Sequence, residues 1–392
     1  MFRRYLKLSG AALAVALAGC TPSGGPAPSG GGICAAAGVF RPGAATLAFT
    51  GDVMAHGLIQ QDAAARATGF APALAPSAPF LRRADVTIVN LETPLAQDVL
   101  PGGAEGQPGD PRIYSDFPVF NAPPAYATAL AGAGVDVVQT ANNHALDRGP
   151  LGVERTLEAV AAVGLSATGT VPRSSSGPWH TIVFTRVGRV ALLACTWSVN
   201  GMPDPARQAL RCYDAAPSVP GLIAQLAADP GIDAVILLPH WGQEYSARPD
   251  AQQRRLARAA IEAGAAAVIG AHPHVLQPIE EITASDGRRG IVAYSLGNFL
   301  SSQWALPRRT GAILYMDLVR DGQGRVVANP PRALPTRVNR YVGSGVTVTP
   351  AALVPDGAAS IAHAAAVLGE NRLLNPSDFG HASLHAGGAA CP

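Results

Sequence analysis

The sequence is poor in charged side chains. Only 14% of its 392 residues are Asp, Glu, Lys or Arg, and the formal net charge is +2. Binding to nucleic acid needs a concentrated basic face, so this charge balance argues against a nucleic-acid partner. Hydrophobic residues make up 48% of the chain. That composition can supply the core of one large domain or of two small ones.

The chain also lacks a comfortable membrane span near its start. The first apolar run, residues 8–18, is too short to cross a bilayer, and basic residues precede it. Leu17-Ala-Gly-Cys20 follows this run and resembles the lipobox of bacterial lipoproteins. We therefore expect residues 1–19 to be a signal peptide. An acylated Cys20 would then hold the exported protein at the periplasmic or extracytoplasmic face of a membrane. The alternative is an ordinary secretory peptide that is cleaved elsewhere.

The next stretch has almost no charge and is rich in Pro, Gly, Ser and Ala. Residues 20–44 cannot form a core of their own, which predicts a flexible linker. We expect the folded domain to occupy residues 45–335. Residues 336–392 carry no motif that we can interpret and are expected to form a C-terminal extension. Its Gly/Ala-rich end favours partial disorder.

Cysteine is scarce, with five in the chain. Apart from Cys20, the even number that remains is compatible with disulfides in an exported protein. Three pairing schemes exist for these four cysteines, and the spacing favours Cys195 with Cys212 and Cys34 with Cys391. None of the four lies among the histidine motifs described below, so we do not expect a zinc–thiolate centre.

From residue 45 onward, apolar runs of strand length alternate with helical patterns, which is typical of an α/β fold. A hairpin is expected from 183–187 and 190–194, with a tight turn at Gly188-Arg189. The other expected strands are 46–50, 86–89, 135–139, 234–238, 265–269 and 290–294, and the expected helices are 124–132, 150–164, 222–228 and 249–264.

Polar residues repeatedly follow the ends of these strands. Ligands of α/β sheets bind at the carboxyl ends of the strands, so this recurrence indicates a site. Buried carboxylates are costly unless they are paired or bind a metal. Carboxylate, amide and imidazole ligands together favour two divalent ions of zinc, manganese or iron rather than calcium. The candidates are Asp52, Glu92, one Asn, and three or four of the five histidines that lie just beyond a strand end, His56, His144, His240, His272 and His274.

His272 and His274 follow the apolar run 265–269 and are one residue apart. In an extended segment, residues i and i+2 point to the same side, so both rings would approach one metal centre. Pro273 between them restricts the backbone. The alternative is a surface loop that happens to carry two histidines.

Six motifs occur in order after the expected strands: Gly51-Asp-Val-Met54, Asn90-Leu-Glu92, Ala141-Asn-Asn-His144, His240-Trp-Gly-Gln-Glu-Tyr245, Gly270-Ala-His-Pro-His274 and Ser295-Leu-Gly-Asn-Phe299. In this order they resemble the CapA-type poly-γ-glutamate synthesis proteins, a branch of the calcineurin-like metallophosphoesterase superfamily. The resemblance covers about residues 45–320. It implies an α/β four-layer sandwich in which two mixed β-sheets are flanked by helices.

The resemblance also implies roles for single residues. Asp52 would bind the first metal with His274, and Glu92 would bridge both metals. His56 lies four residues after Asp52, whereas the superfamily usually places a histidine two residues after its aspartate, so a ligand role for His56 is in doubt. Glu92 stands where most metallophosphoesterases have Asp, which leaves phosphoesterase activity open.

The second metal would be bound by Asn143, His240 and His272. His144 would be the general acid or the electrostatic partner of the substrate. Two cations lower the pKa of a bridging water and hold the electrophile, so no Ser or Cys nucleophile is required. A phosphoester or a γ-glutamyl amide is open to attack in this way.

We therefore expect a metal-dependent hydrolase that acts on an anionic polymer or on its phosphorylated precursor, in contact with capsule-synthesis proteins. Arg308 and Arg309 are expected to be solvated surface charges, and the alternative is that one of them contacts the anionic polymer. One alternative is a general phosphoesterase. The other is a non-catalytic subunit of a capsule export or anchoring complex that keeps the metal-binding fold.

Overall fold

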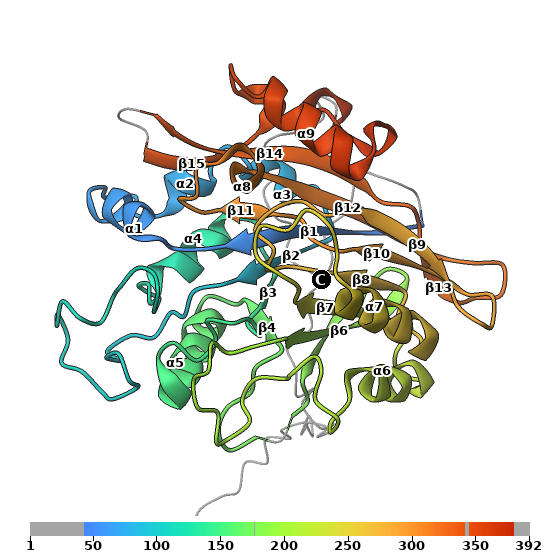
Figure 1. Ribbon diagram of the computed structural model, residues 1–392, viewed down its shortest axis with the longest axis horizontal. Coiled ribbons are helices and arrows are strands. Elements are labelled where there is room, and N and C mark those ends of the chain that lie inside the picture. Colours follow the sequence, from blue (N-terminus) through green and yellow to red (C-terminus); the bar gives the residue numbers. More distant parts are fainter. Residues whose placement is uncertain (1–42, 176, 342–344, 380–392) are drawn as a thin grey trace, which may run out of the picture. The chain divides into compact units, whose positions relative to one another are not determined.

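The computed structural model describes residues 43–175, 177–341 and 345–379. The expected signal peptide, acylated Cys20, most of the linker and the Cys34–Cys391 pairing lie outside these residues. Two β-sheets form the centre of the described part, and helices cover their outer faces (Figure 1). The predicted four-layer α/β sandwich is confirmed.

The larger sheet combines parallel and antiparallel strands. Within the described residues it has nine strands in the order β15-β14-β12-β1-β2-β3-β4, with β11 beside β1 and β13 beside β12. Strands β1 to β4 run parallel, and β12, β14 and β15 are antiparallel to their neighbours. Its strands are β1 (Ala45–Val53), β2 (Val86–Leu91), β3 (Val137–Gln139), β4 (Ser166–Thr168), β11 (Asn298–Leu300), β12 (Thr310–Arg320), β13 (Val326–Ala328), β14 (Arg332–Tyr341) and β15 (Gly345–Pro350).

The second sheet has six strands among the described residues, in the order β5-β6-β7-β8-β10-β9. Its four central strands are parallel, and an antiparallel strand lies at each edge. Its strands are β5 (His180–Thr185), β6 (Gly188–Thr196), β7 (Ala234–His240), β8 (Ala267–Ile269), β9 (Ile279–Thr283) and β10 (Arg289–Ala293).

The strands alternate between two apolar environments. In β7, Ile236 and Leu238 pack into the core between the sheets, whereas Val235 and Leu237 pack against the outer helices. This alternation follows from the two-residue period of a strand. Because both faces of β7 are covered by apolar side chains, the sequence of this strand is a continuous apolar run.

Helices form the outer layers. α6 and α7 cover the six-stranded sheet, and α1 to α4 pack on the far face of the nine-stranded sheet (Figure 1). The helices are α1 (Gly57–Ala64), α2 (Ala71–Leu74), α3 (Ala78–Leu81), α4 (Ala125–Ala133), α5 (Gly149–Ala162), α6 (Val219–Ala228), α7 (Ala251–Ala263), α8 (Leu306–Arg309) and α9 (Ala358–Leu368). None of them combines the length and apolar character needed to cross a bilayer, within the part of the chain that the structure describes.

The start of α7 is fixed by its own sequence. The Asp250 carboxylate accepts from the Gln253 backbone N–H at 2.8 Å, and the Gln253 side chain accepts from the Asp250 N–H at 2.9 Å. This capping box satisfies two N–H groups that the helix leaves free. It fixes the chain directly after the motif that begins at His240.

The C-terminal region contributes to the larger sheet. The boundary expected at residue 335 lies inside β14, which pairs with both β12 and β15. Ala364 and Leu368 of α9 belong to the core between the sheets. The described residues up to 379 are therefore part of the same sandwich, because β14 and β15 continue the larger sheet and α9 packs against it.

Two local predictions have definite outcomes. The hairpin forms, but Thr185 pairs with Gly188, so its turn is Arg186-Val187 and the predicted turn at Gly188-Arg189 is wrong. Gly188 has φ 130°, a value that glycine adopts readily, and it begins the second strand instead. The predicted disulfide between Cys195 and Cys212 is confirmed.

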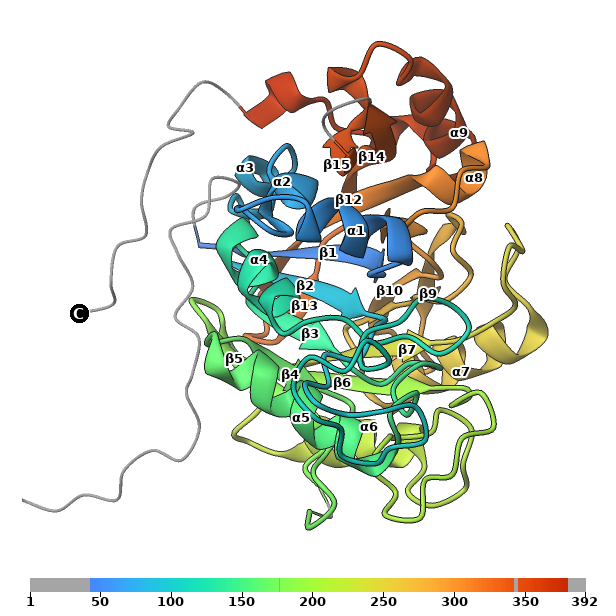
Figure 2. The same ribbon diagram turned by 90° about the vertical axis from the view of Figure 1, so that its left-hand side faces the viewer.

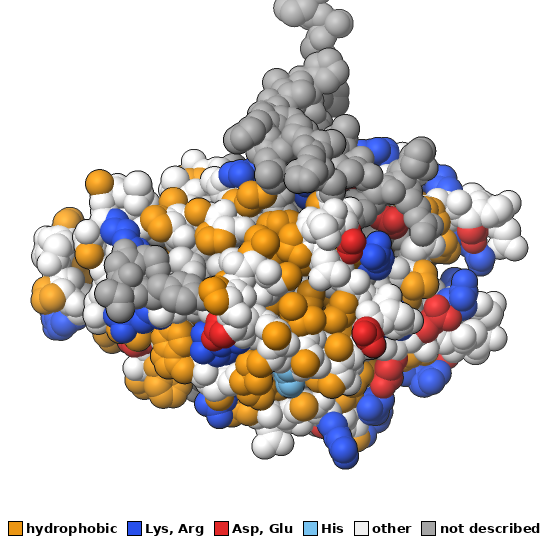
Figure 3. Space-filling view, turned by 90° about the horizontal axis from the view of Figure 1, so that it is seen from above, with side chains coloured by type: hydrophobic (Ala, Val, Ile, Leu, Met, Phe, Trp, Pro, Cys, Tyr) orange, Lys and Arg blue, Asp and Glu red, His pale blue; other side chains and the backbone are white. Residues whose placement is uncertain are grey.

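The face seen from above in Figure 3 is chemically mixed. Apolar side chains gather over its middle, and Arg, Asp and Glu side chains lie in small groups around them. Groups of both signs are interspersed on this face.

Candidate metal centre

The site begins where β1 and β2 end side by side (Figure 2). Asp52 pairs with Asn90 in this register, and Glu92 follows β2 directly. At Gly51 an added Cβ would lie 1.7 Å from the Gly297 carbonyl oxygen, so only glycine permits the approach of the Ser295–Phe299 motif. The Asp52 N–H donates to the same Gly297 oxygen at 3.0 Å.

Asn90 links the two carboxylates. Its Nδ2 lies 2.8 Å from Asp52 Oδ1 and 3.4 Å from Glu92 Oε2. Asp52 and Glu92 are both fully buried. An amide N–H pointing at two buried carboxylates lowers the cost of bringing them together, but it does not neutralise their charge.

The histidine loop reaches Asp52 from the other sheet. His274 Nδ1 lies 2.9 Å from Asp52 Oδ2, and the His272 backbone N–H donates to Asp52 Oδ1 at 3.2 Å. The extended conformation expected for this loop is wrong, since His272 has φ 99° and His274 has φ 57°. Non-glycine residues adopt such angles at a cost of roughly 1–3 kcal/mol, and they do so most often at functional sites. Both rings nevertheless turn to the centre.

His240 and Asn143 form the other side of the centre. His240 Nε2 lies 2.9 Å from Asn143 Oδ1 and 3.4 Å from Glu92 Oε1. The ring centroids of His240 and His272 are 4.7 Å apart. All six predicted ligands thus meet at one buried place, although they come from both sheets.

The donor set fits divalent cations. Possible ligand atoms lie within 4.8 Å of one another in the groups Asp52–Glu92–His274 and Glu92–His240–His272. Glu92 belongs to both groups. Its Oε1 and the Nδ1 of His272 are buried and have no hydrogen-bond partner among the described residues. Buried acceptors without a proton donor are costly, and a cation held between these groups would satisfy them.

The electrostatics of the centre agree with this fit. Burial raises the pKa of Glu92 well above its usual range, and the nearby charge of Asp52 raises it further. Burial acts in the same direction on Asp52, but the hydrogen bond and charge of His274 outweigh it and lower that pKa. Burial, reinforced by neighbouring imidazoles, lowers the pKa of His240 well below its usual range and that of His272 to about 3. Neutral imidazoles are the form that binds a metal.

His144 lies beside the centre and is oriented by a second residue. Its Nδ1 is 2.7 Å from Asp147 Oδ2, and the same oxygen accepts from the Phe120 backbone N–H at 2.7 Å. The Phe120 ring also packs edge-on against His144 at 4.7 Å. An imidazole that donates from Nδ1 to a carboxylate leaves Nε2 free to face a substrate.

His56 has a different environment from the predicted ligands. Its Nδ1 accepts from the Ser302 backbone N–H at 3.3 Å, and its ring lies edge-on to Phe120. Burial lowers its pKa to about 4, although the charge of Asp116 opposes this shift. Among the described residues, His56 belongs to none of the groups with metal-binding spacing. It is a neutral packing histidine near the centre.

Two residues of the site, Asn90 and Asp147, were given no role from the sequence, whereas Glu244 was expected either to support the ligands or to be exposed. Asn90 shares the side of β2 that Glu92 occupies two residues later, a signal available from the strand period. Asp147 lies three residues after His144, a spacing that indicates a partner only when the local turn is known. Glu244 is exposed, yet its carboxylate oxygen comes within 4.8 Å of ligand atoms of His272 and His274.

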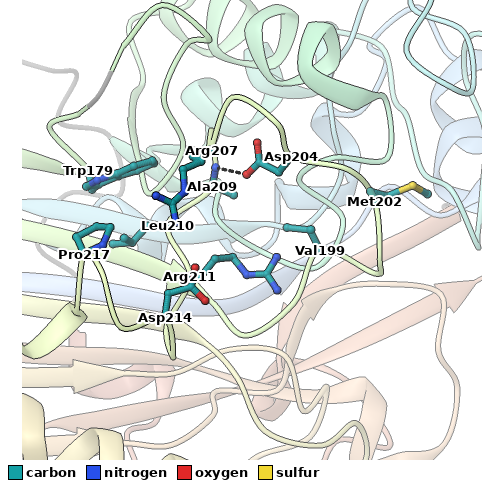
Figure 4. A pocket seen from close by; sticks show the side chains of 10 residues that line it. All are labelled: Trp179, Val199, Met202, Asp204, Arg207, Ala209, Leu210, Arg211, Asp214 and Pro217. Carbon is teal, nitrogen blue, oxygen red and sulfur yellow. Dashed lines mark hydrogen bonds between the residues drawn. The ribbon is translucent and has the colours of Figure 1, made fainter.

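A pocket of about 350 Å³ lies apart from these ligands (Figure 4). Arg207 and Arg211 line it together with Asp204, which accepts from the Ala209 backbone N–H at 3.1 Å. Asp204, Arg207 and Arg211 lie in the loop between Cys195 and Cys212, which the confirmed disulfide closes. Arg211 donates to the Trp197 carbonyl at 3.2 Å, and the Trp197 ring lies 5.6 Å from that of His272. The loop therefore supports the rim of the candidate centre.

Comparison with known proteins gives the family. The family model described as "Bacterial capsule synthesis protein PGA_cap" matches residues 46–303, which is more than half of the chain and includes all six motifs. The chain belongs to the PGA_cap family. The resemblance to CapA-type proteins is confirmed by this match.

Relatives in the PGA_cap family include two from Bacillus. The chain is 34% identical over 206 residues to the PGA biosynthesis protein CapA of Bacillus subtilis, covering 50% of each chain. It is 30% identical over 245 residues to the capsule biosynthesis protein CapA of Bacillus anthracis, covering 60% of this chain and 56% of that one. The chain thus spans about half the length of these curated relatives.

Among solved structures, the comparison matches that of the Haemophilus influenzae NAD nucleotidase NadN. The sequence identity is 13% and the TM-score is 0.46, with 84% of this chain and 63% of that chain covered. At this level of similarity, the assignment to the PGA_cap family rests on the family match alone.

Proposed function

We propose that this PGA_cap protein is a dinuclear-metal hydrolase of an anionic capsule polymer, poly-γ-glutamate, or of its phosphorylated precursor. One observation carries the proposal. Glu92 is buried and belongs to two groups of metal-binding spacing, one with Asp52 and His274 and one with His240 and His272. A carboxylate shared in this way is what a bridging ligand between two metals requires.

The residues of the chain divide between the two positions. Asp52 and His274 would hold the first ion, and Asn143, His240 and His272 the second, with Glu92 bound to both. When bound, such ions lower the pKa of a water and polarise the oxygen of the electrophile. The ligand types suit zinc, manganese or iron.

His144 supplies the proton for the leaving group in this proposal. The Asp147 carboxylate fixes the proton on Nδ1 and stabilises the imidazolium that forms when Nε2 also takes up a proton. Nε2 can then donate to the oxygen or nitrogen that leaves. The buried setting of both side chains limits competing contacts with water.

Hydrolysis of bis(4-nitrophenyl) phosphate by the purified protein tests the catalytic part of this proposal. We expect turnover in wild type, its loss in Glu92→Ala, and full turnover in the exposed control Glu158→Ala. Retained turnover in Glu92→Ala would reject the bridging role. No turnover in wild type with bound metal would favour a binding subunit of a capsule complex.

We also propose that acylated Cys20 anchors the protein at the outer face of a membrane, next to its polymer. Radioactive palmitate incorporated in the producing cell should label wild type and not Cys20→Ser. Label in both proteins would contradict the anchor.

A further inference from the structure

Two neighbouring arginines at α8 have different roles in the structure. Arg309 Nε donates to the Val338 carbonyl at 3.0 Å, and its Nη2 donates to Asn339 Oδ1 at 3.1 Å. Arg309 therefore connects α8 to β14. The Arg308 guanidinium instead lies over the Tyr245 ring, 3.6 Å from its centroid. No carboxylate forms an ion pair with Arg308 among the described residues.

Arg308 is held in place through its backbone by the last of the six motifs. Asn298 Nδ2 donates to the Arg308 carbonyl at 2.7 Å, and the Arg308 N–H donates to the Ala305 carbonyl at 2.8 Å. Asn298 is fully buried and stands opposite Asp52 in the β1–β11 register. The position of Arg308 is thus tied to a strand that carries a metal ligand.

Tyr245 is held by the histidine loop. Its N–H donates to the Pro273 carbonyl at 2.7 Å, and Pro273 separates the two histidines. Tyr245 has φ 64°, an uncommon angle for a tyrosine, which the surrounding contacts must maintain. Its ring centroid lies 6.0 Å from that of His274. The guanidinium and the phenol therefore sit together at the mouth of the candidate centre.

This stacking leaves the donors of Arg308 available. An aromatic ring attracts the face of a guanidinium, whereas the N–H groups point outward in its plane. In this geometry the guanidinium can donate two parallel hydrogen bonds to a carboxylate that lies in its plane. Glu244, which precedes Tyr245 in the sequence, has a carboxylate oxygen within 4.8 Å of ligand atoms of His272 and His274, and its side chain also interacts with that of Tyr245.

We propose that Arg308, stacked on Tyr245, binds a free α-carboxylate of the γ-linked polymer beside the bond to be cleaved. The inference rests on the proposed function and adds to it the residue that recognises the closely spaced carboxylates of the polymer. Arg308 is a specificity-determining residue, and Tyr245 positions it.

Calorimetric titration of the full chain in detergent with a γ-linked glutamate tetramer tests this inference. Loss of a bidentate charged contact corresponds to a roughly 10–100-fold increase in Kd. We expect this increase in Arg308→Gln, a smaller one in Arg308→Lys, and none in Arg255→Gln, an exposed arginine of α7. The tetramer with its α-carboxylates converted to amides should bind wild type and Arg308→Gln equally.

Three results would overturn the inference: no binding of the tetramer to wild type, wild-type affinity in Arg308→Gln, or an equal loss in Arg255→Gln. Metal content and bis(4-nitrophenyl) phosphate hydrolysis, measured on the same samples, report separately on the proposed function. If the protein hydrolyses the diester but binds the tetramer equally well with and without Arg308, only the recognition role of Arg308 is rejected. If binding of the tetramer depends on Arg308 but the diester is not hydrolysed, the hydrolase activity is rejected and the recognition role of Arg308 stands.

Discussion

Asn90 on β2 and His240 on β7 meet across the two sheets, with Nδ2 of Asn90 3.2 Å from Nδ1 of His240. An amide nitrogen only donates, so His240 Nδ1 accepts and its Nε2 proton is directed to Asn143 Oδ1. A neutral ring that binds a cation at Nε2 carries its proton on Nδ1, so Asn90 would orient the metal-bound ring by turning its amide oxygen to accept from Nδ1.

Replacing Asn90 should therefore weaken metal binding without removing a ligand. Loss of a residue that orients ligands typically costs 10–100-fold in metal affinity. We expect a loss of that size in Asn90→Ala, measured by competition with a chromophoric chelator. The exposed control Asn371→Ala should bind like wild type. Equal affinity in Asn90→Ala and the control would show that Asn90 does not orient the centre.

The leaving group should decide how much His144 matters. General acid catalysis contributes about 10²–10⁴-fold, and most where the leaving group is a poor one. We expect His144→Gln to lower kcat by this factor for an alkyl phosphodiester and far less for the 4-nitrophenyl ester. Metal content should stay at the wild-type level. Equal losses for both substrates would contradict proton donation by His144.

Acid should destabilise the metal-free protein through its buried neutral histidines. The folded-state pKa of His56 is about 4, below its ordinary value of 6.5, mainly because the ring is buried. Between these values the unfolded chain binds the proton more strongly, so stability is lost as the pH falls from 6.5 to 4. The loss is at most ~3 kcal/mol for this group, and His272, whose pKa is about 3, acts in the same direction.

Urea unfolding in the presence of a chelator, at several pH values from 7 to 4, checks this expectation. His56→Gln keeps an acceptor for the Ser302 N–H and removes the titrating group. The variant should lose less stability than wild type over this range. An identical pH dependence in the two proteins would mean that His56 does not contribute.

The disulfide between Cys195 and Cys212 closes a loop with a sequence separation of 17 residues. Closing a loop of this size stabilises a fold by roughly 3 kcal/mol through the unfolded chain. Cys195→Ala/Cys212→Ala should lower the free energy of unfolding by that order, measured by urea denaturation. An unchanged stability would show that the loop is held by its other contacts, such as the hydrogen bonds of Asp204.

The positions of most central strands follow from the sequence because both faces of each sheet are covered. β7 shows the reason: apolar side chains on its two faces yield an unbroken apolar run, and His240 ends it at the polar edge. The candidate ligands could be located for the same reason, since they gather at carboxyl ends of strands, and the resemblance to CapA-type proteins selected the six among them.

What the sequence did not reveal depends on contacts between distant segments. Asn90 is important because His240 arrives from the other sheet, and no local pattern reports that approach. The positive φ values of His272 and His274 are imposed by contacts of their loop with Asp52 and Tyr245. β14 and α9 carry no site motif, so their place in the sandwich emerges only from tertiary packing.

Metal content by mass spectrometry tests the central claim most directly. Wild type and His272→Ala/His274→Ala would be purified side by side after reconstitution with zinc, manganese or iron. Two equivalents of one metal in wild type, falling to one or none in the double variant, are the predicted result. Wild type without bound metal under all three conditions would contradict the dinuclear centre, and with it the proposed hydrolase.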